Sequence, residues 1–261
     1  MKGAGLGESS LRNHGLLLRS ALSTAVKDRY LPENPLEHLR LPTVNNSRKG
    51  KPLTTDELRR IVARMPTTAD KGFTLVMGRC GRRPGEAMAL QVKSGDFTRN
   101  EIVVSRRYSE RGGDLHADTP KNWKTRRVPM PTDVAKALAL LVADKLPTAD
   151  LFTGERGGTL RLSNWRTRRF ERALTGLDLD ADHVVYDLRH TFASLVVRAG
   201  GSVKTLQMVM GHADISTTMR HHAHLFPDDL DRVRTVLNET ADYPLTTGTE
   251  GEAPALRAVG D

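Results

Sequence analysis

The stretch "YDLRHTFASLVVRAG", residues 186–200, decides the fold of this chain. Its apolar residues recur at helical spacing, and the glycine that ends it is a typical helix stop. Arg189 and His190 stand together on this predicted helix, and Tyr186 precedes the arginine by one helical turn. The helix therefore offers a guanidinium, a good phosphate-binding group, close to its start.

Two other stretches also place a phosphate-binding side chain at the start or end of a predicted helix. "CGRRPGEAMALQ", residues 80–91, carries Arg83 directly before a proline that suits the first position of a helix. "MGHADISTTM", residues 210–219, carries His212 at the end of a further predicted helix. Each stretch alone is a weak signal, because arginine and histidine are common at the ends of ordinary helices.

In this order, and with a basic hairpin between the first two, the three stretches closely resemble the catalytic domain of the tyrosine recombinases, the phage integrase family. The resemblance runs from about Leu53 to Leu237 and is most specific over residues 186–226. The part before Leu53 resembles the end of the family's helical core-binding domain. We expect a shortened segment of that kind, without an arm-binding module.

The expected fold is mainly α, an α+β arrangement in which helices surround one small antiparallel sheet. Alternating residues at 101–108 predict one strand of that sheet, and residues 125–131, which end in prolines, predict a second short strand after a turn at 110–115. Apolar periodicity predicts helices near residues 9–31, 54–62, 73–81, 84–91, 132–146, 162–174, 187–200, 203–212 and 227–237. The expected parts are a partial core-binding (DNA-clamping) segment at 1–42, a linker at 43–52, the catalytic domain at 53–237 and a flexible acidic tail at 238–261.

The resemblance implies a chemical role for each matched residue. Arg83 and Arg189 would hold the non-bridging oxygens of a scissile DNA phosphate, and His212 would hydrogen-bond to the same group. Lys121, with Lys124 as its rival in the same loop, would protonate the leaving 5′ oxygen. Tyr186 stands where many family members have a histidine and keeps one hydroxyl donor.

Two further residues near these motifs are expected to be structural. Glu86 follows Arg83 by three positions, which suits a brace for the arginine or a helix cap. His190 is interpreted as a buried structural partner of the motif rather than as a catalyst.

The family's nucleophilic tyrosine is missing from its expected place. It should stand nine or ten residues after His212, where this chain has His221 and His222, and the following "AHLF" aligns His222 with it. Three interpretations stay open. The chain is a DNA-binding relic or decoy, or another nucleophile acts (His222, water activated by the arginines, or Tyr243 from the tail), or the histidines, including His224, bind a metal. Adjacent histidines on a helix point about 100° apart, which disfavours the metal site.

Charge points to a polyanionic partner. The chain holds 40 basic and 31 acidic residues, a formal net charge of +9. Because the tail holds five acids and one base, residues 1–237 carry about +13. We expect duplex DNA as the partner, the alternative being a merely soluble basic protein. The expected DNA contacts are Arg48, Lys49, Lys51, Arg106, Arg107, Lys124, Arg126 and Arg127.

The remaining features exclude several classes of protein. The single Cys80 excludes an internal disulfide framework, and its apolar surroundings favour a reduced, buried thiol. No apolar run is long enough to cross a bilayer, so we expect a cytoplasmic, nucleoid-associated protein without a membrane partner. The resemblance implies no cofactor, no metal, no small-molecule substrate, and a homo-oligomer, a tetramer, on DNA.

Overall fold

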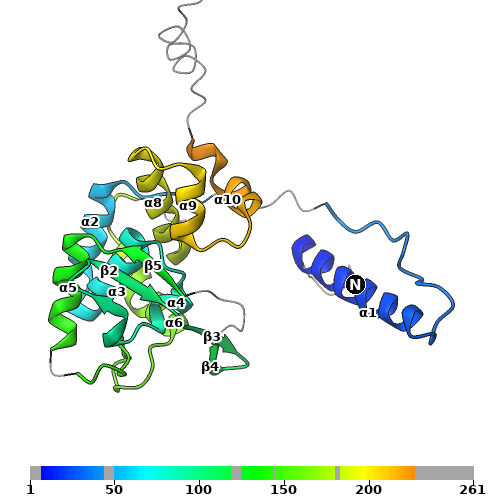
Figure 1. Ribbon diagram of the computed structural model, residues 1–261, viewed down its shortest axis with the longest axis horizontal. Coiled ribbons are helices and arrows are strands. Elements are labelled where there is room, and N and C mark those ends of the chain that lie inside the picture. Colours follow the sequence, from blue (N-terminus) through cyan, green and yellow to red (C-terminus); the bar gives the residue numbers. More distant parts are fainter. Residues whose placement is uncertain (1–6, 44–49, 119–124, 144, 180–182, 227–261) are drawn as a thin grey trace, which may run out of the picture.

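The structure is a computed structural model that describes residues 7–43, 50–118, 125–143, 145–179 and 183–226. Its larger part is a helical body with two small antiparallel sheets (Figure 1). The expected mainly α fold is thus confirmed. Among these residues, no helix is both long and apolar enough to cross a membrane.

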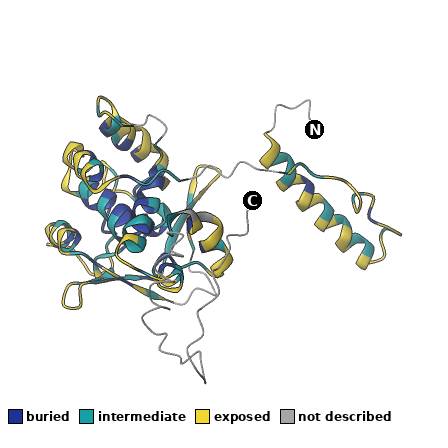
Figure 2. Cartoon of the chain, turned by 90° about the horizontal axis from the view of Figure 1, so that it is seen from above, coloured by how far each residue is buried: buried dark blue, intermediate teal, exposed yellow. Residues whose placement is uncertain are grey.

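The N-terminal segment consists of α1 (Glu8–Lys27) and the chain that returns along it. Asn34 ties the two together, because its side-chain amide donates to the Arg19 carbonyl and to the Ser23 hydroxyl. The Leu41 side chain lies against Gly15, the buried residue of this helix. In Figures 1 and 2 the segment stands apart from the helical body, and most of α1 is exposed or half-buried.

The body is built around α3 (Thr68–Cys80), which packs against α5 (Thr132–Val142) and α8 (Val185–Arg198). Phe73 of α3 meets Phe152 and Trp165 edge to face at the centre of the apolar core. The other helical elements are α2 (Thr55–Arg64), α4 (Pro84–Met88), η2 (Val92–Ser94), α6 (Leu162–Trp165), η3 (Arg166–Phe170), α7 (Glu171–Leu174), α9 (Val203–Met210), α10 (Ile215–His222) and η4 (Ala223–Leu225).

Local sequence signals account for most of these boundaries. Thr54 and Glu57, three residues apart, form a capping box at the start of α2, each side chain bonding to the backbone of the other residue. Pro84 occupies the first turn of α4 as expected. α5 begins at Thr132, where the expected stretch begins, and Pro131 occupies the cap position. The helix expected at 162–174 contains a π-helical turn over Arg166–Phe170.

The single sheet expected from the sequence is two sheets. β1 (Gly95–Asp96), β2 (Glu101–Val104) and β5 (Arg126–Pro129) form one, with Val104 opposite Arg126. β3 (Arg107–Arg111) and β4 (Asp114–Asp118) form a separate hairpin. Its turn, Gly112–Gly113, has positive φ at both residues, the conformation that a two-residue hairpin loop requires. The chain leaves the first sheet between β2 and β3, so the alternation over 101–108 does not mark one strand.

Candidate active site

Two helix ends meet beside the sheet and create the site. α3 ends at Gly81 and α9 at Gly211, both in the left-handed conformation. A Cβ at Gly81 would lie 2.2 Å from the Phe192 ring, and one at Gly211 would lie 2.5 Å from Cζ of Arg126. Both the backbone conformation and the lack of space therefore require glycine at these two turns.

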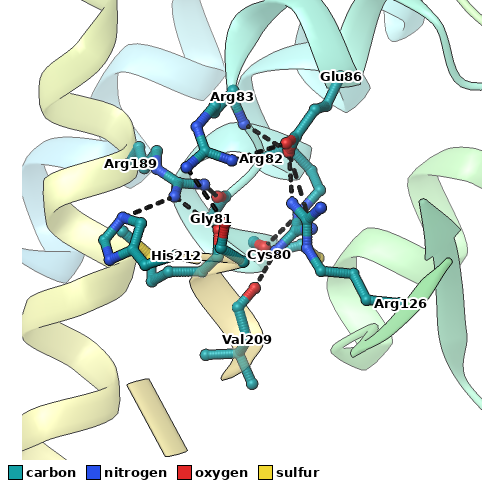
Figure 3. A network of polar contacts seen from close by, with 11 residues as sticks. Cys80, Gly81, Arg82, Arg83, Glu86, Arg126, Arg189, Val209 and His212 are labelled. Atoms are coloured by element: carbon teal, nitrogen blue, oxygen red, sulfur yellow. Dashed lines mark hydrogen bonds and ion pairs between the residues drawn. The ribbon is translucent and has the colours of Figure 1, made fainter. Parts of the chain in front are cut away.

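One buried carboxylate, that of Glu86 on α4, organises the arginines around these turns (Figure 3). It accepts from Nη1 of Arg83 at 2.9 Å, from the backbone N of Arg83 at 3.1 Å, and from Nη2 of Arg126 at 2.6 Å. Nη1 of Arg82 lies 3.9 Å away. Burial raises the pKa of Glu86, but the positive charges of Arg126, Arg82, Arg83 and Arg189 outweigh it and lower the pKa below the ordinary value.

The last carbonyls of α9 and its C-cap hold three arginines from other elements. Arg82 Nη2 donates to the Val209 carbonyl at 2.5 Å, Arg189 Nη2 to that of Met210 at 2.7 Å, and Arg83 Nη2 to that of Gly211 at 3.3 Å. Carbonyls at a helix C-terminus lack partners within the helix and carry partial negative charge, so cations stabilise them.

Arg189 joins the two turns. Besides Met210, its guanidinium donates through Nη1 to the Gly81 carbonyl, and the residue is only 1% exposed. Burial, followed by the like charge of Arg83, lowers the pKa of Arg189 to about 10, so it stays a cation at neutral pH.

His212 lies beside Arg189. Its Nε2 is 3.2 Å from Nη2 of Arg189, and its Nδ1 is 2.8 Å from the hydroxyl of Thr218 on α10. A guanidinium only donates, so Nε2 must accept, and the neutral imidazole then carries its proton on Nδ1 and donates to Thr218. α10 thereby fixes the orientation of the ring.

The histidines form a continuous stack at the edge of the site. The His222 ring lies parallel to that of His212 at a centroid distance of 5.8 Å, and the His190 ring, tilted by 56°, has its centroid 5.3 Å from that of His222. Tyr186 meets His190 edge to face and is 43% exposed, whereas His222 is 2% exposed. The His190 ring also packs against Gly50 of the chain that precedes α2.

The charges of the site do not balance. Among the residues that the structure describes, the arginine cluster consists of Arg82, Arg83, Arg126 and Arg189 around one carboxylate, that of Glu86, which leaves an excess of three positive charges. Arg83 is the most exposed member described, with 30% of its side chain accessible. The arrangement favours an anion that approaches from the side of Arg83.

The comparisons with known proteins agree with this geometry. A sequence profile described as the phage integrase family matches residues 51–228. The chain belongs to the phage integrase family. The tyrosine recombinase XerC of Brucella suis biovar 1 (strain 1330) is 33% identical over 181 residues, covering 64% of this chain and 53% of that protein. The ICEBs1 integrase of Bacillus subtilis (strain 168) is 28% identical over 239 residues, covering 86% and 64%.

Solved structures show the same fold. The Tn1549 transposon integrase, in complex with a circular intermediate DNA, superposes with a TM-score of 0.75 at 22% identity, covering 92% of this chain and 82% of that one. XerH bound to its difH substrate gives a TM-score of 0.61 at 18% identity, covering 92% and 67%. The integrase-family chain spans about half the length of the XerC relative that it matches.

The structure brings together five of the six predicted catalytic residues of this integrase-family chain, which are Arg83, Tyr186, Arg189, His212 and His222. Lys121 and its rival Lys124 lie outside the described residues, as do Arg48, Lys49, the segment 227–237 and the tail with Tyr243. The side chains of His221 and His224 are also not described. In the described part of the chain, no group of three or more His, Cys, Asp or Glu residues could hold a metal ion.

The predicted DNA contacts have varied surroundings. Arg126 differs most from the expectation, because its guanidinium belongs to the arginine cluster and its side chain is 15% exposed. Arg127 pairs with Glu101 at 2.9 Å and Arg107 with Asp118 at 3.1 Å. Arg106 lies over the Tyr108 ring, and the backbone N of Lys51 donates to Asp187 at 3.1 Å.

The sequence did not predict that Arg82 and Arg126 belong to the arginine cluster. Adjacent arginines at 82 and 83 were a signal, but the resemblance matched only Arg83 to a family arginine. Glu86 was expected to brace Arg83 or to cap a helix, and it does both. Cys80 is buried as expected, and burial raises the pKa of its thiol to about 12.

Proposed function

We propose that this chain is an integrase-type recombination protein that binds duplex DNA and engages one backbone phosphate at Arg83, Arg189 and His212. The observation that carries the proposal is the excess of positive charge in the arginine cluster, with Arg83 partly accessible. Related recombinases with the same fold have been solved in complex with DNA, which supports the choice of partner. The net charge of +9 favours the same partner.

The chemistry expected at this site is in-line transfer at phosphorus. Negative charge that builds on the non-bridging oxygens would be stabilised by the two arginine forks, which are already oriented by backbone carbonyls. His212 would add one hydrogen bond from Nε2 once its proton has moved there and Nδ1 accepts from the Thr218 hydroxyl, and Lys121 would protonate the leaving 5′ oxygen. Tyr186 would contribute a hydroxyl at the rim of the site. Assembly on DNA as a tetramer remains part of the proposal.

Strand cleavage is impaired in this chain because His222 takes the place of the tyrosine. Support comes from its position, since the imidazole is buried in the site and stacks on His212. It offers no hydroxyl that could form a phosphotyrosyl bond. The protein then acts as a non-catalytic DNA-binding relic or as a regulator of recombination.

A second candidate function is metal-independent nicking. His222 could attack phosphorus through a ring nitrogen, which would break the bond to the 5′ oxygen and give a phosphoramidate that water then hydrolyses, or water activated by the arginines could attack directly. Either route leaves a 3′ phosphate and a 5′ hydroxyl. The close approach of His222 to His212 is the observation that favours this candidate. Nicking differs from the first candidate, DNA binding without catalysis, because it leaves a cut DNA strand.

Two measurements on the unaltered chain test these proposals. Affinity for duplex DNA should fall steeply as salt rises from about 50 to 200 mM, because bound phosphates release counterions. An affinity that barely changes would contradict DNA binding through this cluster. Incubation with a library of nicked duplexes, followed by a denaturing gel, should show neither adduct nor new cut. A covalent adduct would overturn the claim of impairment, and a cut without an adduct would establish nicking.

A further inference from the structure

Arg82 is the one arginine of the cluster without access to solvent. It is 0% exposed, its Nε donates to the Cys80 carbonyl at 2.7 Å, and its Nη2 donates to the Val209 carbonyl at 2.5 Å. Its Nη1 has no hydrogen-bond partner among the described residues and lies 3.9 Å from Glu86. Its Nε and Nη2 are thus both committed to backbone carbonyls of the two turns.

The two carbonyls that Arg82 holds belong to the two turns that build the site. Cys80 is the last residue of α3, directly before Gly81 and Arg83's loop, and Val209 lies in the last turn of α9, just before Gly211 and His212. Arg83 and Arg189 also bridge to this end of α9, but the proposed function gives both of them a phosphate to bind. Arg82 is the arginine of this group to which the proposed function gives no phosphate.

We infer that Arg82 is a positioning residue that holds the end of α9, and with it His212, in register with Arg83 and Arg189. The inference rests on the proposed function only where it concerns DNA. The 3.2 Å contact between His212 Nε2 and Arg189 depends on the distance between the two turns, and Arg82 spans that distance. Burying the charge of Arg82, whose acidic neighbour Glu86 is 3.9 Å away, costs folding free energy that an apolar residue at this position would not cost. An arginine there therefore indicates that the two turns must be held at a fixed distance.

The shape of the side chain explains why the clamp is an arginine. Its planar fork donates in two fixed directions at once, toward Cys80 and toward Val209, whereas a lysine ammonium has a single centre. Burial first, and then the charge of Arg126, lower the pKa of Arg82 to about 9, with Glu86 opposing both. The group therefore remains a cation at neutral pH.

NMR on the imidazole of His212 tests the inference without DNA. In Arg82→Met and in Arg82→Lys we expect the Nδ1 proton of His212 to exchange with water faster, by about tenfold, because the ring loses its fixed contact with Arg189. Leu138→Ala, in the core of α5, is the control: it should lower stability but leave the His212 signals unchanged. Unchanged His212 signals in both folded Arg82 variants would overturn the inference, and so would an equal change in Leu138→Ala.

A second measurement needs no variant. In the unaltered chain the Nε proton of Arg82 should exchange at least about 100-fold more slowly than that of Arg59, whose side chain is 72% exposed. Equal exchange rates would show that the clamp does not persist in solution. If the chain fails to bind DNA while both NMR results hold, the proposed function is wrong and the positioning role of Arg82 stands.

Discussion

The imidazole of His222 lies parallel to that of His212, with an angle of 8° between the rings and their centroids 5.8 Å apart. His212 is fixed by Arg189 on one nitrogen and by Thr218 on the other. His222, which we propose to occupy the place of the family tyrosine, is therefore directed into the site, with 2% of its surface exposed, and does not point to solvent. On that proposal, the imidazole stands in the nucleophile's position without a hydroxyl oxygen.

His222→Tyr is expected to restore covalent cleavage. The phenol oxygen would attack phosphorus, the bond to the 5′ oxygen would break, and the 5′ hydroxyl would leave with a proton. A nicked duplex should then trap a protein–DNA adduct on a denaturing gel, where the unaltered chain gives none. His222→Phe, with the same ring and no oxygen, is the control and should give no adduct. A His222→Tyr protein that folds, binds DNA and forms no adduct would contradict the placement of the phosphate at Arg83, Arg189 and His212.

Arg83→Gln should weaken DNA binding. The change removes a charge-assisted fork, worth about 1.5–3 kcal/mol, or roughly 10- to 100-fold in affinity. It should also reduce the slope of log affinity against log salt by about one. Fluorescence anisotropy at several salt concentrations measures both quantities.

Arg59→Gln is the matched control for that substitution. It removes the same charge from an exposed arginine of α2 whose described partner is Asp56. Its effect on affinity should be small, since exposed ion pairs and distant charges are screened by salt. Equal losses in both variants would mean that net charge, and not the arginine cluster, decides affinity.

Glu86→Gln should destabilise the protein at neutral pH by about 3–5 kcal/mol, because it leaves buried guanidinium groups without their carboxylate. The pKa of Glu86 is lower in the folded protein than its ordinary value of about 4.3. Its stabilising contribution is therefore complete above that value and is lost as pH falls through the folded pKa. Urea unfolding from pH 7 to pH 3 should show the difference between the two proteins shrinking toward acid pH. A constant difference would show that the Glu86 charge does not hold the cluster together.

Much of the fold and part of the site could be predicted because their signals are local. The capping box at Thr54 and Glu57 and the proline at the start of α4 each depend on residues within one helical turn. The mainly α fold class followed from such signals. The motif residues around Arg83, Arg189 and His212 were identified by spacing and resemblance, and the structure brings them together.

The rest depends on distances between segments far apart in the chain. Whether Arg82 or Arg126 faces solvent is decided by where the Gly81 and Gly211 turns meet, and no local pattern contains that information. The break between β2 and β3 likewise follows from different pairing partners, since Val104 lies opposite Arg126 and Arg107 lies opposite Asp118. A basic stretch with alternating residues has the same sequence pattern whether it forms one strand or two strands in different sheets.

The chain that precedes α2 is expected to influence the histidine stack through Gly50. A Cβ at this position would lie 2.2 Å from the His190 ring, which in turn packs on His222. Gly50→Ala should therefore displace His190 and cost about 1–3 kcal/mol of stability, as overpacking does. Gly158→Ala is the matched control, because nothing lies within 4 Å of its Cβ, and it should leave stability unchanged or raise it by up to about 1 kcal/mol. Urea unfolding of both variants measures the costs, and the imidazole signals of His190 and His222 should shift only in Gly50→Ala. Equal stability and unchanged signals in the two variants would show that the packing of Gly50 on His190 is not maintained in solution.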